Sequence, residues 1–375
     1  MLYLKTASKW NALPIDNKSR DEIKKGFFGN RDKLSIIETL YLIDSRNAIC
    51  YSNNKPISFN ELASRFSKND RFLAKYITYK DWRDRGLIIR EDKTKGEEKN
   101  IVKIYKKYKF TLPKYKVKGL FFSGDLISVI DDKKLGKELY DKYWLGQYGV
   151  YKSGERGILN KLDIFETIYL IDNNVLELDY SKEKVLNLAR KRIEFFDYIY
   201  NVYKDWRSKG YIVKTGFKFG THFRIYKPGT RPNASKHIHS MHLLHVFPPE
   251  AKLLISEWAR VVRVAHSVRK TFILAVPKEI KQKKMDLDFI LFYRHGSVAD
   301  TPNISKPKFA MRSFGEEEQI GGKEISSIMR EAKKLRLQLI LGIADRETAV
   351  TYYKLREIKL EASKNNYYEI DWFQP

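Results

Sequence analysis

The stretch from Tyr203 to Lys270 decides both the fold and the chemistry of this chain. It reads YKDWRSKGYIVKTGFKFGTHFRIY from Tyr203 to Tyr226, HSMHLLHVFP from His239 to Pro248 and RVVRVAHSVRK from Arg260 to Lys270. Six of the seven histidines lie between His222 and His266, among tyrosines, lysines, arginines and few acids. Such imidazole, phenol and cationic groups suit phosphodiester chemistry without a metal. A metal-dependent nuclease would instead need clustered carboxylates to hold its cation.

The same stretch predicts a regular order of elements. A helix ends in the YKDWR segment, with Gly210 as its C-terminal stop. The strand YIVK then pairs with FRIY through the glycine-containing turn FKFGTH. Beyond the histidines, an amphipathic helix is expected from Leu253 to Lys270, followed by the strand TFILAV.

Two segments of the chain occur twice. GNRDKLSIIETLYLID (Gly29–Asp44) returns as KLDIFETIYLID (Lys161–Asp172), and YKDWRDRGLIIR (Tyr79–Arg90) returns as YKDWRSKGYIVK (Tyr203–Lys214). The order and nearly equal offsets predict two copies of one module. Each copy should close with a hairpin, on Ile104–Tyr105 in the first and on Ile225–Tyr226 in the second.

The second copy carries an insertion, roughly QYGVYKSGERG at 147–157. Its glycines and basic residues predict an exposed basic loop near 147–161 rather than a core element. Lys152, Arg156 and Lys161 could reach an RNA backbone from this loop. A tolerated surface insertion with no role in binding is the alternative.

The last part of the chain echoes the second half of the middle copy. After a polar linker (277–286), DFILFYRHG resembles THFRIYKPG, and ISSIMREAKKLRLQLILGIA resembles ISEWARVVRVAHSVRKTFILAV. We therefore expect an N-terminal half-module at 1–112 and a full unit at 113–280, with an N-terminal half at 113–226 and a C-terminal half at 227–280. A further half-module follows at 281–375. The predicted fold class is α/β (α+β), built from repeated units.

The composition of the chain limits the classes of function that it can have. The chain has 375 residues, 43% of them hydrophobic, and a formal net charge of +26, so we expect folded domains and a polyanionic partner such as nucleic acid. A merely basic, soluble protein is the alternative. The single cysteine, Cys50, cannot form an internal disulfide, and no spacing suggests zinc. The N-terminus lacks the apolar core of a signal peptide, so a cytoplasmic protein is expected.

The segments FRIY, HSMHLLHVFP, RVVRVAHSVRKTFILAV and the closing VTYYKLREI resemble the archaeal tRNA-splicing endonucleases. The three-part layout resembles the homodimeric class whose single chain fuses three units. This resemblance implies an RNA endonuclease that excises introns from precursor tRNA at bulge–helix–bulge junctions, without metal or cofactor. It implies 2′,3′-cyclic phosphate and 5′-hydroxyl ends, and C-terminal half-modules similar to restriction-endonuclease cores.

The resemblance also implies a catalytic triad of Tyr226, His239 and Lys270. In the family the tyrosine is the general base on the 2′-hydroxyl, the histidine protonates the 5′-leaving oxygen, and the lysine stabilises charge on the phosphate. Histidine titrates near neutrality, and a nearby cation can make a tyrosine a better base. His237 is an alternative to His239, because the preceding loop is longer than is usual in the family.

Two further sets of residues follow from the resemblance. Arg263 and Arg356 are implied to clamp a flipped-out bulge base, with solvated surface charges as the alternative. Glu316, Glu317 and Glu318 are implied to dock into a basic pocket of a neighbouring unit, with an ordinary exposed loop as the alternative.

The last part of the chain also tests the triad. Matching YRHG to YKPG pairs Tyr293 with Tyr226, Lys306 with His239 and Leu337 with Lys270, so this part should be structural.

Two other functions remain open on the residues. One is a metal-dependent DNA nuclease on a similar core, with PPEAK (248–252) as its only hint. The other is a non-catalytic RNA-binding scaffold, which would leave the coexistence of Tyr226, His239 and Lys270 without a reason.

Overall fold

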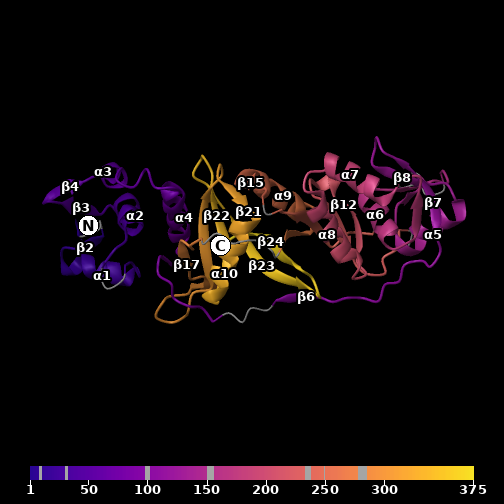
Figure 1. Ribbon diagram of the computed structural model, residues 1–375. Helices are drawn as coiled ribbons and strands as arrows, with labels where there is room; N and C mark the ends of the chain where they lie inside the picture. The colour runs from indigo at the N-terminus through magenta and orange to yellow at the C-terminus, as the bar shows by residue number, and fades with distance from the viewer. Residues whose placement is uncertain are drawn as a thin grey trace.

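The computed structural model describes residues 1–7, 11–29, 33–97, 102–149, 156–232, 238–248, 250–277 and 285–375. Within these residues the chain forms an elongated molecule (Figure 1), with a small sheet at each end and an eleven-stranded sheet between them. The mixed α/β fold predicted from the sequence is confirmed. None of the helices in this part of the chain is long and apolar enough to span a membrane.

The N-terminal end is a sheet of order β2-β1-β3-β4, packed with helices. Its elements are β1 (Tyr3–Thr6), β2 (Ala12–Pro14), α1 (Asn17–Lys25), α2 (Ile36–Arg46), β3 (Ile49–Ser52), β4 (Lys55–Ile57), α3 (Phe59–Ala63) and α4 (Phe72–Asp84). A capping box between Ser35 and Glu38 begins α2. Gly86, with φ of 75°, follows the YKDWR segment of this copy, as Gly210 does in the second copy.

The opposite end is a sheet of order β11-β7-β8-β10-β9. Its elements are β7 (Val117–Phe122), β8 (Ile127–Ile130), α5 (Lys133–Tyr143), β9 (Gln147–Tyr148), β10 (Asn160–Leu162), α6 (Ile164–Asp172), β11 (Leu176–Leu178), α7 (Lys182–Arg192) and α8 (Phe196–Arg207). A capping box between Asp163 and Glu166 begins α6, and Gly210, with φ of 87°, follows α8.

The central sheet has the order β12-β13-β14-β16-β24-β23-β22-β20-β17-β5, and β6 pairs with β23. Its strands are β5 (Ile89–Arg90), β6 (Lys103–Tyr105), β12 (Ile212–Thr215), β13 (Phe223–Tyr226), β14 (His242–Val246), β16 (Thr271–Pro277), β17 (Phe289–Leu291), β20 (Phe309–Gly315), β22 (Gln338–Ala344), β23 (Val350–Leu360) and β24 (Asn365–Phe373). Smaller elements are η2 (Phe217–Phe219), β15 (Lys252–Leu254), α9 (Ile255–Ser267), β18 (Arg294–His295), β19 (Val298–Ala299), β21 (Gln319–Gly321) and α10 (Gly322–Lys334). The predicted strand TFILAV lies in β16, and the amphipathic helix is shorter than predicted, because Lys252–Leu254 form a strand.

Helices cover both faces of the central sheet. Trp258 of α9 and Ile328 of α10 lie in one apolar core with Leu243, Leu339 and Tyr353. On the other face, residues of α8 pack with β14, β16 and β24, and residues of α4 pack with β20, β22 and β23. Strands with two covered faces are apolar throughout, which agrees with runs such as FILAV.

The strands follow the same order of pairing from either edge of the central sheet towards its centre. The hydrogen bonds of α4 correspond to those of α8. The Tyr352 hydroxyl donates to Asp81 of α4, and the Tyr367 hydroxyl donates to Asp205 of α8, each at 2.6 Å. Other hydrogen bonds also correspond: Tyr76 to Asp44 and Tyr200 to Asp172, each at 2.6 Å. The N-terminal segment thus packs on the last part of the chain in the same way as the middle segment packs on the strands that follow it.

The predicted hairpin closing on Ile104–Tyr105 is wrong. β5 pairs antiparallel with β17, and β6 pairs parallel with β23. Tyr105 instead enters the core beside α8, where its hydroxyl is 3.0 Å from Nε2 of His242. In the second copy the predicted hairpin is confirmed, because Val213 lies opposite Ile225.

Candidate active site

Tyr226, His239 and Lys270 lie at the same end of three neighbouring strands. Tyr226 is the last residue of β13, His239 precedes β14, and Lys270 immediately precedes β16. β13 runs antiparallel to β14, with Ile225 opposite His242, and β14 runs parallel to β16. The end of β13 therefore meets the beginnings of β14 and β16.

Hydrogen bonds hold the segment around His239 in this place. The amide of Met241 donates to the carbonyl of Ile225 at 2.7 Å, so the residues before β14 lie beside Tyr226. Nζ of Lys270 donates to the carbonyl oxygen of Ser240 at 3.0 Å. The lysine ammonium thus lies against the main chain next to His239.

The site has a cationic character. Burial lowers the pKa of Lys270 below its ordinary value, and the positive charge of Arg224 lowers this pKa further. Tyr226 is buried, its ring lies 4.7 Å from that of Trp144, and the guanidinium of Arg224 lies 5.8 Å from the Tyr226 ring. Cations near a phenol favour its ionised form. His239 is exposed, so its imidazole is open to a large substrate. His237, the alternative, falls outside the described residues.

The neighbouring histidines are structural in this arrangement. His242 is buried against Tyr105. The rings of His222 and His245 lie 4.3 Å apart, and Nδ1 of His222 accepts from the amide of Val246 at 3.0 Å. Burial lowers the pKa of His222 to about 4 and those of His242 and His245 to about 3, so all three are neutral near pH 7.

Within one chain, Arg263 and Arg356 do not lie close together. Arg263 is exposed on α9 and interacts with the hydroxyl of Tyr353. Tyr353 belongs to the core under α9 and α10, and side chains alternate along β23. Arg356, three residues further along this strand, therefore points to the opposite face of the sheet.

The prediction of an exposed loop near 147–161 is wrong at its two ends, because β9 (Gln147–Tyr148) pairs there with β10 (Asn160–Leu162). Lys161 lies in β10 opposite Gln147, and its Nζ donates to the carbonyl of Gly149 at 2.5 Å. Arg156 is exposed, as expected for a basic loop, whereas Lys152 falls outside the described residues. The Lys161 ammonium retains two further protons for other contacts.

The acidic cluster Glu316–Glu318 makes contacts within its own chain. Arg346 forms ion pairs with Glu316 and Glu317, and the carboxylate of Glu318 accepts from the amide of Gly315 at 2.7 Å. The carbonyls of Glu318 and Glu316 accept from the amides that begin α9, at Ile255 and Ser256. This loop therefore joins the last part of the chain to the middle part.

The strand register corrects one predicted match in the last part of the chain. Ile290 lies opposite Arg90, and the amide of Phe292 donates to the carbonyl of Ile88. In the middle copy, Ile212 occupies the place of Ile88 in the repeated segment and lies opposite Tyr226. The position that corresponds to Tyr226 is thus held by Phe292, not by Tyr293, and it has no hydroxyl.

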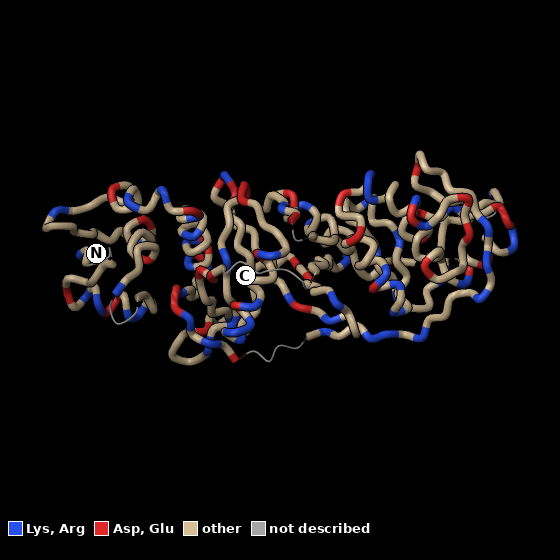
Figure 2. Tube along the Cα trace, viewed as in Figure 1, with Lys and Arg blue, Asp and Glu red and all other residues tan. Residues whose placement is uncertain are grey.

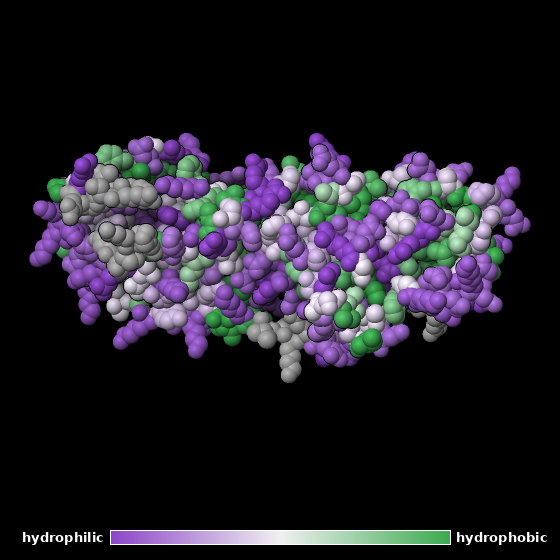
Figure 3. All heavy atoms as spheres, turned by 180° about the vertical axis from the view of Figure 1, so that it is seen from behind, coloured by the Kyte–Doolittle hydropathy of each residue, from purple (hydrophilic) through white to green (hydrophobic). Residues whose placement is uncertain are grey.

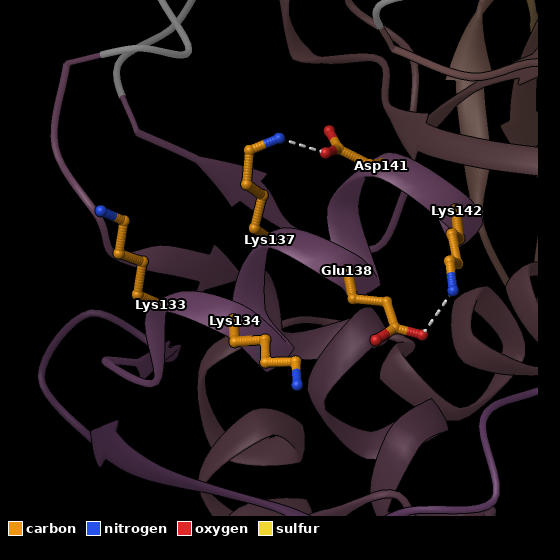
Figure 4. Close-up of a pocket in the computed structure, with 6 residues that line it drawn as sticks. All are labelled: Lys133, Lys134, Lys137, Glu138, Asp141 and Lys142. Atoms are coloured by element: carbon orange, nitrogen blue, oxygen red, sulfur yellow. Dashed lines mark hydrogen bonds and ion pairs between the residues drawn. The ribbon is translucent and has the colours of Figure 1, made fainter.

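A surface hollow of about 470 Å³ lies elsewhere, on α5. Lys133, Lys134, Lys137, Glu138, Asp141 and Lys142 line it. Figure 4 shows Lys137 directed at Asp141 and Lys142 at Glu138, and the second pair is 2.9 Å apart. None of the three residues at the sheet end lines this hollow, so it is not the candidate active site.

Residues 196–286 match the family described as tRNA intron endonuclease, catalytic C-terminal domain. The chain is 37% identical over 164 residues to the tRNA-splicing endonuclease of Thermococcus kodakarensis, which is 42% of this chain and 89% of that protein. It is 34% identical over 142 residues to the enzyme of the same name from Methanopyrus kandleri (36% and 76%), and 40% identical over 123 residues to that from Pyrococcus furiosus (32% and 68%).

The matched residues include Tyr226, His239 and Lys270, so the sheet end described above falls inside the catalytic domain of an endonuclease. The chain belongs to the archaeal tRNA-splicing endonuclease family.

Proposed function

We propose that this chain excises introns from precursor tRNA by cutting both bulge–helix–bulge junctions through a metal-independent transesterification. The products are a 2′,3′-cyclic phosphate and a 5′-hydroxyl. The observation that carries the proposal is the meeting of Tyr226, the His239 segment and Lys270 at one sheet end, inside the matched catalytic domain. A phenol, an imidazole and an ammonium group are the base, acid and charge stabiliser that this reaction needs.

In this mechanism, Tyr226 takes the proton of the ribose 2′-hydroxyl as the 2′-oxygen attacks phosphorus. The bond from phosphorus to the 5′-oxygen breaks, and the imidazolium of His239 gives its proton to that oxygen. Lys270 stabilises the charge that builds on the non-bridging oxygens. Arg224 places a positive charge 5.8 Å from the centre of the Tyr226 ring.

The proposed architecture keeps the three parts at 1–112, 113–280 and 281–375. The corresponding contacts of α4 and α8 support two related units, one of them formed by the first and last parts together. With Phe292 and Leu337 in place of Tyr226 and Lys270, this second unit is structural. The C-terminal halves would then be restriction-endonuclease-like cores.

The proposed assembly is a homodimer, because excision needs two cuts and each chain offers one complete set of the three residues. A two-fold axis would place the two sites against two similar bulges. RNA contacts are proposed for Arg263 and Arg356 at a bulge base, and for Lys152, Arg156 and Lys161 at the backbone. Glu316, Glu317 and Glu318 are proposed as the assembly loop.

The test is cleavage of a short bulge–helix–bulge RNA in excess EDTA, with the end groups mapped. His239→Ala should lower the single-turnover rate about 10²–10⁴-fold, the usual contribution of a general acid. His266→Ala is the matched control, since His266 is an exposed helix residue whose ring lies 5.3 Å from that of Trp372.

Each alternative function has its own outcome in this assay. Loss of cutting in EDTA would replace the proposal with a metal-dependent nuclease. Binding without any cutting by the native chain would point to an RNA-binding scaffold.

A further inference from the structure

The segment Lys103–Lys118 is unusually basic, and we call it the basic strap. It reads KIYKKYKFTLPKYKVK, contains seven lysines and has no acidic residue; the next acid along the chain is Asp125. It joins β6 at the central sheet to β7 of the five-stranded sheet (Figure 1). Figure 2 shows basic residues along this connection.

The strap passes the end of the central sheet that carries the candidate active site. Tyr105 contacts His242, the first residue of β14. The amide of Tyr108 donates to the carbonyl of Lys209 at 3.0 Å, just before β12 begins at Ile212. Because Ile212 lies opposite Tyr226, this part of the strap lies at the same sheet end as Tyr226.

A second path of contacts joins the strap to the site. The Phe110 ring lies 6.4 Å from that of Tyr143, and the guanidinium of Arg207 lies 5.0 Å from the Phe110 ring. Trp144, the next residue after Tyr143, lies 4.7 Å from the ring of Tyr226. These aromatic contacts fix the course of the strap beside the catalytic end of the sheet.

The lysine side chains of the strap face solvent. Lys106, Lys107, Lys109, Lys114 and Lys116 are exposed, and no ion pair joins any of them to an acidic residue in the part of the chain that the structure describes. The Lys103 ammonium, at the start of the strap, lies 3.7 Å from the carboxylate of Glu369, and the backbone amide of Lys107 donates to the carboxylate of Glu361 at 2.6 Å. Tyr108 is 48% exposed among these lysines, and its ring lies 5.8 Å from that of Tyr211 in an edge-to-face contact. An ordered segment thus presents seven lysines against two nearby carboxylates, together with a partly exposed aromatic ring.

We propose that the basic strap binds the phosphate backbone of the RNA strand that flanks the cleaved bond, with Tyr108 as a stacking surface for an unpaired base. This inference rests on the proposed function and adds a binding track outside the residues that cut. Lysines beside an exposed aromatic ring are the usual combination for an extended RNA strand.

The test compares two variants that lose the same charge. The strap variant carries Lys106→Gln, Lys107→Gln and Lys109→Gln. The control carries Lys18→Gln, Lys24→Gln and Lys25→Gln, exposed residues of α1 at the far end of the molecule (Figure 1). The ligand is a precursor tRNA with 2′-deoxyribose at both cleavage sites, so that binding is measured without cutting.

We expect the strap variant to bind about tenfold more weakly near 0.15 M salt, and its plot of log K against log salt to be less steep by about two to three. The α1 control should change the slope by much less than one. Tyr108→Leu should weaken binding about fivefold or more with an unchanged slope, because stacking releases no counterions.

The outcomes separate this inference from the proposed function. If the strap variant and the α1 control weaken binding equally, the strap is not a binding track and only the general charge matters. If the strap variant alone loses affinity while the native chain fails to cut the all-ribose RNA, RNA binding by the strap is supported and the proposed cleavage is contradicted. Thermal unfolding of each variant identifies any loss that comes from misfolding.

Discussion

At the scale of single residues, the buried histidines couple stability to pH. Burial holds the pKa of His222 at about 4 and those of His242 and His245 at about 3, whereas the unfolded chain binds these protons near pH 6.5. Their folded pKa values are lowered, so their effect is to reduce stability as pH falls from about 6.5 towards 4. Each proton that the unfolded chain binds and the folded chain does not lowers the free energy of unfolding by about 1.4 kcal/mol per pH unit.

A comparison of variants isolates this effect from other titrating groups. The urea midpoint of His245→Leu should fall less between pH 7 and pH 5 than that of the native chain, whatever its value at pH 7. His266→Leu, at an exposed helix position, should leave the native pH dependence unchanged. An equal decline in the native chain and in His245→Leu would mean that His245 is protonated in the folded state.

The same scale shows what the sequence could and could not predict about the site. Tyr226, His239 and Lys270 were identified from motifs, and strand pairing brings them to one sheet end. The match of Tyr293 to Tyr226 failed by one residue, because pairing with Ile88–Arg90 sets the register of β17. Local sequence similarity gives no information about this pairing between segments that lie far apart in the sequence.

At the scale of elements, the two helix-terminating glycines offer a matched pair. Gly86 and Gly210 both have positive φ, so an alanine at either position costs about 1 kcal/mol in backbone strain. A Cβ at Gly86 would meet nothing within 4 Å, whereas at Gly210 it would lie 3.1 Å from Cβ and 3.2 Å from the carbonyl oxygen of Tyr108. We therefore expect Gly210→Ala to lower the free energy of unfolding by about 1–2 kcal/mol more than Gly86→Ala, measured by urea denaturation. Equal losses of unfolding free energy in the two variants would show that the strap moves away from the new Cβ at no energetic cost.

The elements themselves were largely predictable, but their partners were not. The YKDWR helices, their glycine stops and the strand TFILAV follow from local patterns. β5 has only two residues and pairs with a strand from the far end of the chain, so no local turn signal marks its partner. The hairpin prediction failed because it assumed that neighbours in sequence pair in space.

At the scale of the whole molecule, one chain combines two related arrangements around a shared sheet. β23 and β24 lie side by side at its centre, and each supplies a tyrosine to an aspartate of the helix on its own side. The repeats predicted related parts, but not that the first and last parts would pack together. Most of the molecule's surface on the side shown in Figure 3 is hydrophilic, with hydrophobic residues in small groups.

This arrangement leads to a prediction about the assembly. Each chain carries Tyr226, His239 and Lys270 once, and Phe292 and Leu337 replace two of these residues in the other unit. If each set of three residues makes one cut, as we propose, two cuts in one precursor tRNA require two chains. We expect a solution mass of about twice 44.3 kDa by light scattering.

A mixed dimer of one native and one His239→Ala chain, purified through two different tags, should cut only one junction in each binding event. RNA cut at a single junction should therefore accumulate under single-turnover conditions, whereas the native dimer releases the intron with little of this intermediate. Release of the intron by the mixed dimer at the native rate, or full activity from a monomer, would show that one site serves both junctions.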